Sequence, residues 1–413
     1  MSAGAPEPRS ALLARRGLVL ALVALGAFYG AWLGFRVQTM GDYPGDYAPA
    51  MNALLAGHIG AFFAHLPTNG AGGSVLLRAP AAWLGKELIG SQLAIFRFGA
   101  FACLLAAGAL GLHLARGLRE AGEPPLARAC AVGVCLLAPP VLDAIFFGHP
   151  DEPLGAALCV GAVLLAAARR PGAAGVVLGL ALINKPWGVL AVPCILLCAR
   201  QRRVLILVLA GSIGAMWVGA AWVSDPGHFA HTVFGASNSI VAHPVDIWWP
   251  LAHRVSAPGV LTAYFPPHVV SAHARELSVL LALPLGLALA RRGDRTAGDC
   301  LALLALLFLL RCLLDPSNHV YYQVPFVLAL TAWEAWCGRA PLLAFAAMLA
   351  FWLEFHAVSG TGSLTAQFIA YHLIALPLAV MLLRVVLGEE PLPRRVWVFL
   401  GPYPRNPQIG RLM

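Results

Sequence analysis

Long apolar runs recur along almost the whole chain, and no other feature restricts its fold as strongly. About twelve of these runs lie between residues 17 and 386, and about 20 apolar residues are enough to cross a membrane as a helix. Hydrophobic residues make up 60% of the sequence and charged residues 11%. Soluble domains are about 45–50% apolar and about 25% charged. The sequence therefore predicts an all-α, polytopic transmembrane bundle and excludes a soluble fold.

Small groups of Arg residues flank alternate runs, as expected where basic loops stay in the cytoplasm. This placement puts both termini on the cytoplasmic side. It also accounts for the formal net charge of +9 without nucleic acid, for which a basic stripe would be expected. The predicted spans are 17–37, 93–115, 127–147, 153–168, 172–185, 187–199, 204–223, 277–290, 297–314, 320–337, 341–358 and 367–386.

We predict one membrane domain, residues 17–387, between cytoplasmic tails at 1–16 and 388–413. The fifth and sixth spans are too short to cross the membrane and are separated by Lys185-Pro186, which breaks a helix. They are expected to form a re-entrant hairpin with its tip near the outer face. The chain has only two lysines and is rich in Ala, Leu and Gly, which suggests a bacterial plasma membrane protein.

Two long segments, 38–92 and 224–276, fall on the outer face in this topology. The first contains an amphipathic run, Ala48 to Phe63, and then a Gly-rich turn from Thr68 to Gly73. The second is marked by aromatic residues. Such stretches predict helices lying in the membrane interface, although the aromatic residues could instead stack on a substrate. They are Trp248, Trp249, Tyr264 and Phe265.

The ionisable residues gather on the outer face, and those at a membrane boundary are functional candidates because burying them is costly. Asp42 and Asp46 directly follow the first span. Asp46 could cap the next helix, whereas Asp42 is expected to lie outside its start. Two neighbouring carboxylates suit a general base beside an orienting or metal-binding group.

A tight outer turn between the third and fourth spans carries three ionisable residues, His149, Asp151 and Glu152. Asp151 could simply cap the fourth span. Three such residues within four positions exceed what one cap needs, so they are candidate substrate contacts.

Two cations interrupt apolar sequence. Lys185 sits at the helix break and could snorkel to the interface or contact a phosphate. Arg311 could pair with Asp315 one turn later or also contact a phosphate. A polar segment follows Arg311 and carries His319, Tyr321 and Tyr322.

Two segments resemble a known family. Asp42 and the helical stretch Ala48–Gly57 look like a first outer loop that opens with a catalytic Asp and ends its amphipathic helix in a Gly. Gly148–Pro193 is similar to the same family's central block and is the more specific match. These segments resemble the GT-C superfamily of membrane glycosyltransferases, which use polyprenyl-phosphate sugars, and especially its bacterial mannosyltransferase-like branch. Asp46 competes with Asp42 for the catalytic position.

The resemblance implies transfer of a sugar, mannose or another hexose or pentose, to a glycan, lipid or protein acceptor on the outer face. The leaving phosphate is already anionic, so the reaction needs a base and positive charge but no general acid. Inversion follows from a single displacement. A divalent cation is the one cofactor left open. The implied base is Asp42 or Asp46, and the phosphate contacts are Lys185, Arg311 and His319.

Two other classes compete with this interpretation. A lipid or small-molecule transporter would place charged groups along a gate and hold its substrate at a broken hairpin. The ionisable residues cluster on one face and no inverted repeat is evident, so a transporter is disfavoured. A structural or assembly protein would not explain the acidic outer turns.

Overall fold

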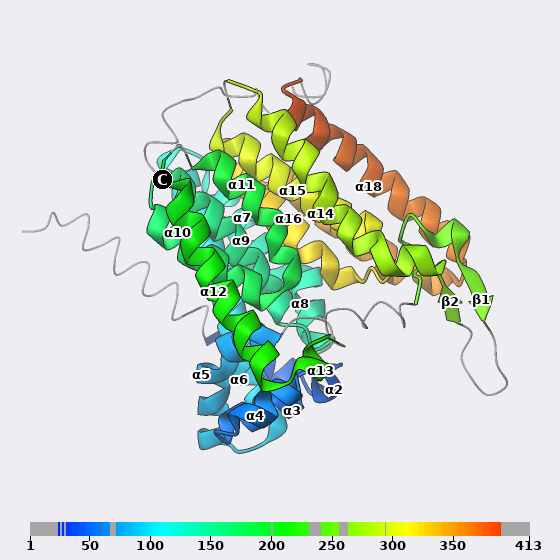
Figure 1. Cartoon of the computed structure of the whole chain (residues 1–413). Coiled ribbons are helices and arrows are strands. Elements are labelled where there is room, and N and C mark those ends of the chain that lie inside the picture. Colours follow the sequence, from blue (N-terminus) through cyan, green and yellow to red (C-terminus); the bar gives the residue numbers. More distant parts are fainter. Residues whose placement is uncertain are drawn as a thin grey trace, which may run out of the picture.

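Helices dominate the computed structural model, which confirms the predicted all-α bundle (Figure 1). Seven helices in the described part are long and apolar enough to cross a membrane, whereas the count of twelve spans remains a prediction. The predicted tail 1–16, part of the predicted first span and nearly all of the predicted tail 388–413 lie outside the described residues. The structure describes residues 24, 27–28, 30–66, 72–199, 201–230, 241–255, 263–293 and 295–389.

The helices follow the predicted apolar runs closely. Pro139 separates α7 from α8 because the residue before a proline disfavours helical backbone. The long apolar helices are α6 (Gln92–Glu120), α7 and α8 (Pro125–Leu137 and Pro139–Phe146), α12 (Arg203–Ser224), α14 (His268–Ala290), α15 (Ala297–Leu314), α17 (Leu342–Leu353) and α18 (Leu364–Leu387). A π-helical turn, η6 (Glu354–Val358), and a 3-10 turn, η7 (Ser359–Thr361), extend α17.

Shorter helices complete the bundle. α9 (Asp151–Ala167) and α10 (Pro171–Asn184) are antiparallel neighbours, and η1 (Pro186–Leu190) leads into α11 (Ala191–Cys198). η5 (Val320–Tyr322) leads into α16 (Gln323–Trp336). α10 packs against α9 and α12, whereas α11 packs against α9, α14 and α15. The helix break at Lys185-Pro186 is therefore as predicted, while the membrane path of this pair stays a prediction.

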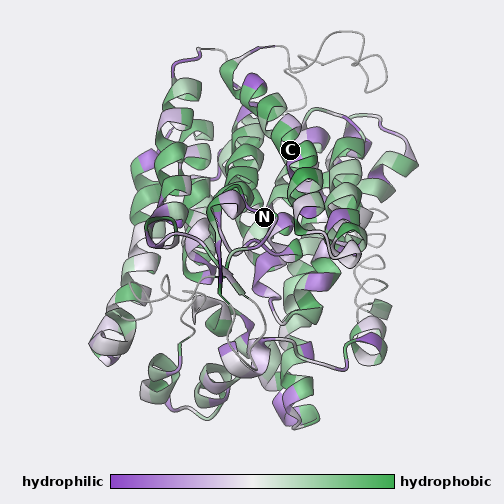
Figure 2. Ribbon diagram, turned by 90° about the vertical axis from the view of Figure 1, so that its right-hand side faces the viewer, coloured by the Kyte–Doolittle hydropathy of each residue, from purple (hydrophilic) through white to green (hydrophobic). Residues whose placement is uncertain are grey.

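α15 lies at the centre of the bundle and α12 at its edge. The most apolar window of α15 is 89% buried, whereas that of α12 is only 17% buried. The exposed side chains of α12 include Leu207, Val208 and Val223. Most of the helical ribbon in Figure 2 is green, the colour of hydrophobic residues. An apolar surface on a peripheral helix is what contact with lipid requires, because lipid solvates apolar side chains.

The first long segment forms four helices: α2 (Tyr43–Asp46), α3 (Ala48–Leu55), α4 (Ile59–Ala64) and α5 (Gly72–Leu88). The predicted amphipathic run is divided at Gly57, whose φ of 76° ends α3 in a conformation that glycine adopts easily. Most of the predicted Gly-rich turn lies outside the described residues, and Gly72 and Gly73 already belong to α5. The sequence analysis did not predict α5, which packs along α6.

The second long segment differs from its prediction. Its aromatic residues form a 3-10 turn, η4 (Trp249–Leu251), and an antiparallel hairpin of β1 (His253–Val255) and β2 (Ala263–Phe265) rather than interfacial helices. β-branched and aromatic residues favour strands, and the Trp249 and Tyr264 rings lie 4.6 Å apart. α13 (Pro226–Ala230) precedes the hairpin. α14 begins at His268, so its first turns occupy residues that were predicted to be loop.

Candidate active site

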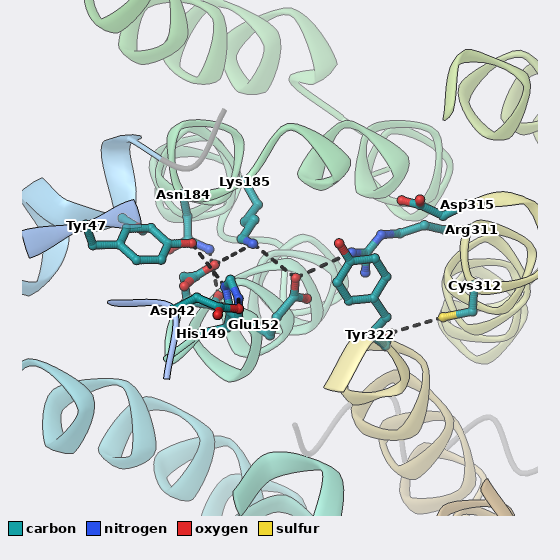
Figure 3. A network of polar contacts seen from close by, with 12 residues as sticks. Asp42, Tyr47, His149, Glu152, Asn184, Lys185, Arg311, Cys312, Asp315 and Tyr322 are labelled. Carbon is teal, nitrogen blue, oxygen red and sulfur yellow. Dashed lines mark hydrogen bonds and ion pairs between the residues drawn. The ribbon is translucent and has the colours of Figure 1, made fainter. Parts of the chain in front are cut away.

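Polar side chains from distant parts of the sequence meet at one end of the bundle, where α9 begins and α10 and α15 end. We call this the site end. Figure 3 shows the group, with Asp42 and His149 on one side, Arg311 and Tyr322 on the other, and Lys185 between them.

Two glycines dock the first polar turn onto the turn between α8 and α9. Gly41 and Gly148 have φ values of 51° and 84°, and a Cβ on either would overlap backbone of the opposite turn. The Asp42 amide donates to the Phe147 carbonyl at 3.0 Å. Main-chain contacts therefore bring Asp42 beside His149.

Asp42, His149 and Tyr47 form a hydrogen-bonded chain. His149 Nε2 lies 3.3 Å from Asp42 Oδ2, and His149 Nδ1 lies 3.3 Å from the Tyr47 hydroxyl. A carboxylate only accepts, so Nε2 donates to Asp42. The His149 side chain is 7% exposed and that of Asp42 is 64% exposed. One Asp42 oxygen is thus held while the carboxylate remains accessible.

The helix-capping expectations for the two acids are wrong. Asp42, predicted to lie outside a helix start, occupies the N-cap position of α2, but its side chain makes no capping bond. Asp46 ends α2, and Tyr47 is the N-cap of α3. Burial raises the pKa of Asp46, with His149 opposing and Asp42 adding to that rise. Neither acid therefore caps a helix with its side chain.

Lys185 is buried between two acids. Its Nζ lies 2.7 Å from Asp151 Oδ2 and 3.2 Å from Glu152 Oε1. Arg311 Nη2 continues the row, 3.4 Å from the same Glu152 oxygen. The expected snorkelling of Lys185 and capping by Asp151 are therefore both wrong, since Asp151 starts α9 without a capping bond. Breaking a buried pair is strongly destabilising, so these charges depend on one another.

Close helix packing at Gly155 positions Lys185. A Cβ on Gly155 would overlap Asn184 and Trp187, the two residues that bracket the helix break. Asn184 donates to the Asp151 carbonyl at 2.9 Å. This contact ties the end of α10 to the start of α9 and directs Lys185 towards Asp151.

Arg311 is held between two aromatic rings. Its guanidinium carbon lies 5.0 Å from the Trp187 ring centre and 4.4 Å from that of Tyr322. Its Nη1 atom is buried and has no hydrogen-bond partner in the described part of the chain. A buried cationic donor without an acceptor is costly. Arg311 is therefore oriented with one donor ready for an anionic ligand.

Asp315 pairs with Arg275 rather than with Arg311. Arg275 Nε and Nη2 lie 3.2 and 3.5 Å from the two carboxylate oxygens of Asp315. Burial raises the pKa of Asp315, but Arg275 and Arg311 outweigh it and hold that pKa below its ordinary value. The predicted pair of Arg311 with Asp315 is not formed as a direct contact. Sequence reasoning missed Arg275 because its segment was assigned to a loop.

Tyr321 lies between two histidine rings. Its ring centre is 4.6 Å from that of His149 and 5.3 Å from that of His319, both stacked. The edge of His243 approaches His319 at 4.6 Å. Burial, with His243 adding to it, lowers the pKa of His319 to about 3. A neutral His319 ring would contact a phosphate through a hydrogen bond rather than an ion pair, and its place at the phosphate stays a prediction.

A second aspartate–histidine pair lies near this aromatic group. His356 Nε2 lies 3.6 Å from Asp143 Oδ2, and the Trp352 ring stacks on His356 at 4.8 Å. Trp352 also packs against the buried cluster of Ala144, Val320 and Tyr321. Sequence reasoning missed this pair because its members are far apart in the chain. No group of three or more His, Cys, Asp or Glu in the described residues is arranged to hold a metal ion.

Comparison with known families identifies the class of protein. Residues 73–316 match the model of glycosyltransferase family 87. The chain belongs to glycosyltransferase family 87. This membership confirms the resemblance to membrane glycosyltransferases and, together with the apolar helices, describes a multi-pass membrane enzyme. It also decides against the transporter alternative.

Other comparisons add little to the family assignment. No match was found among curated proteins. A crystal structure of ArnT from Cupriavidus metallidurans bound to undecaprenyl phosphate is similar, with 18% identity, a TM-score of 0.49, and coverage of 96% of this chain and 74% of that one. The family 87 match includes His149, Asp151, Glu152, Lys185 and Arg311. It ends before His319 and begins after Asp42.

Proposed function

We propose that this family 87 enzyme transfers a sugar from a polyprenyl-phosphate carrier to an acceptor hydroxyl, with Asp42 as the general base. The observation that carries the proposal is the pairing, within one site, of an accessible carboxylate with a buried guanidinium that keeps a free donor. A base and a phosphate-binding cation are the two groups that this reaction requires.

Asp42 suits the base by its hydrogen bonding. His149 donates to Oδ2, while no hydrogen bond of Oδ1 is found among the described residues and the side chain is 64% exposed. An acceptor hydroxyl approaching Oδ1 would meet a carboxylate already fixed in orientation. Asp46 is the reserve candidate because burial raises its pKa above the ordinary value of an aspartate, which makes it a better proton acceptor than an ordinary carboxylate.

Arg311 and Lys185 are suited to the departing phosphate. Arg311 Nη1 lacks a partner, and Lys185 uses two of its three donors on Asp151 and Glu152. Donors fixed in advance stabilise charge that develops in the transition state without reorganising. Their acidic partners keep the empty site neutral, so the phosphate does not need to displace bound anions.

A membrane-embedded phosphate site favours a donor that is itself lipid-linked. Both cations lie at helix ends of a bundle built from apolar helices, where a polyprenyl chain can stay in lipid while its phosphate reaches Arg311. Single displacement would invert the anomeric carbon. We propose that the site faces outward in a bacterial plasma membrane, that the sugar is mannose or another hexose or pentose, and that His149, Asp151, Glu152, Tyr321 and Tyr322 surround it.

The test is transfer by purified enzyme in detergent. Undecaprenyl-phosphate-linked mannose, glucose, galactose and arabinose are incubated with glycan and lipid acceptors, with and without Mg²⁺ or EDTA. We expect one donor to release undecaprenyl phosphate together with a glycosylated acceptor of inverted anomeric configuration. Release without acceptor would indicate hydrolysis. Failure of every donor, while the protein is folded, would contradict the proposal.

A further inference from the structure

A single phenol oxygen holds both ends of the polar segment between α15 and α16. Asn318 Nδ2 and Gln323 Nε2 donate to the Tyr371 hydroxyl at 2.9 and 3.1 Å. Gln323 Nε2 also lies 3.1 Å from Asn318 Oδ1, which closes a triangle. All three side chains are fully buried. Residues five positions apart are therefore fixed to one atom of the last helix, α18.

The segment held in this way touches both sides of the site. Tyr322 lies over the Arg311 guanidinium, on the side proposed for the phosphate. Tyr321 stacks on His149, which orients Asp42. A shift of the segment would move the contacts of the base and of the cation together.

We infer that Tyr371 is a positioning residue for sugar transfer, acting through Asn318 and Gln323 on the segment 318–323. The inference rests on the proposed function, because it assigns a role relative to that reaction. Tyr371 lies beyond the family 87 match, which ends at residue 316. Through Tyr371, α18 thus contributes to the site from outside the matched region.

The physical basis is the cost of leaving buried amide groups without acceptors. Phe351 and Phe355 pack on the Tyr371 ring at 5.2 and 6.0 Å, so the phenol oxygen is fixed in place. Removing that oxygen deprives two buried amides of their common acceptor, and an unsatisfied buried donor is expensive. The segment can recover those bonds only by shifting, and a small displacement of catalytic groups costs much activity.

The first experiment compares Tyr371→Phe with Thr331→Val. Thr331 is also buried, but its hydroxyl bonds to Val327 of its own helix at 2.8 Å and joins no two elements. With the undecaprenyl-phosphate sugar that wild type uses, Tyr371→Phe should lower kcat on the order of 10-fold per folded molecule, with KM for the donor nearly unchanged. Thr331→Val should keep its rate. Equal rates for wild type and Tyr371→Phe would overturn the inference.

Hydrogen–deuterium exchange separates this inference from the proposed function. Tyr371→Phe should speed exchange in peptides covering 318–323 and leave peptides of α6 unchanged. Unchanged exchange at 318–323 would overturn the inference whatever the activity. Faster exchange in an enzyme whose wild type uses no polyprenyl-phosphate donor would instead overturn the proposed function and leave the anchoring intact.

A double-variant comparison tests whether the three residues act as one unit. Gln323→Leu removes one of the two bonds to Tyr371 and also the bond to Asn318. The double variant, Gln323→Leu with Tyr371→Phe, should therefore lose less activity than the product of the two single losses. Multiplication of the two effects would show independent roles and contradict a shared clamp.

Discussion

On the Asp42 side of the site a carboxylate faces solvent at the end of a hydrogen-bonded chain, whereas on the Lys185 side the charges are buried and paired with one another. The difference matches the two substrates of the proposed reaction. An acceptor hydroxyl needs an accessible base whose oxygen is not already bound. A phosphate on a lipid needs rigid donors near the membrane, with acids that keep the empty site neutral.

Removing the base should have the largest effect. Asn is nearly isosteric with Asp but cannot take a proton, so Asp42→Asn should lower transfer by about 10²- to 10⁴-fold. Binding of undecaprenyl phosphate, measured by its effect on thermal unfolding, should stay as in wild type. The proposed contacts of that ligand are Lys185 and Arg311, not Asp42. Near-normal transfer by Asp42→Asn would show that Asp42 is not the base and that the two sides of the site are not divided in this way.

The geometry of the cation should matter next. Arg311→Lys keeps the charge but loses the planar fork that lies between Trp187 and Tyr322. We expect kcat/KM for the donor to fall roughly 10²-fold, as for loss of one oxyanion donor. Arg384→Lys, on the exposed face of α18, is the matched control and should have wild-type kinetics. If Arg311→Lys were equally active, charge alone would explain the site.

Orientation of Asp42 should have a smaller effect. His149→Ala removes the donor to Asp42 Oδ2 and should slow transfer on the order of 10-fold. His149→Gln places an amide donor near the position of Nε2 and should recover most of that loss. Both variants should bind undecaprenyl phosphate normally. Equal activity of the Ala and Gln variants would show that the hydrogen bond to Asp42 plays no part.

Asp46→Asn should have the smallest effect, less than about 10-fold, because proton transfer stays with Asp42. The pH dependence of kcat/KM is a second test of whether Asp46 is the base. Burial raises the pKa of Asp46, so a transfer that depended on ionised Asp46 would be lost as pH falls through that raised pKa, and Asp46→Asn would remove this limb. A greater loss than that of Asp42→Asn would make Asp46 the base.

The helices were predictable because lipid imposes a long apolar run on every span, a signal carried by neighbouring residues. The break at Lys185 followed from Pro186 in the same way. α5 was not predicted because Arg78, Lys86 and Glu87 interrupt its apolar pattern. The strands β1 and β2 were not predicted because interfacial helices and short strands use the same aromatic residues.

Several residues that meet in the site could be predicted from the sequence, but the contacts between them could not. Asp42, His149, Lys185 and Arg311 stood out as polar residues at the ends of apolar runs. Their contacts depend on which helices lie side by side, and no local pattern contains that information. Arg311 therefore meets Glu152, 159 residues away, rather than the acid one turn further on. For the same reason the role of Tyr371 could not be predicted, because in the sequence it is an ordinary aromatic residue of an apolar helix.

The contact between Asp42 and His149 has a consequence for biogenesis, because its partners are 107 residues apart. A membrane protein enters the bilayer from its N-terminus, so the first polar turn emerges long before α8 can receive it. The partners of Lys185 are already present when it is inserted, Arg311 follows later, and Tyr371 comes last. A chain released after α16 would contain the base and both cations but not the atom that fixes the segment between them. The full catalytic rate should therefore appear only once α18 has been inserted.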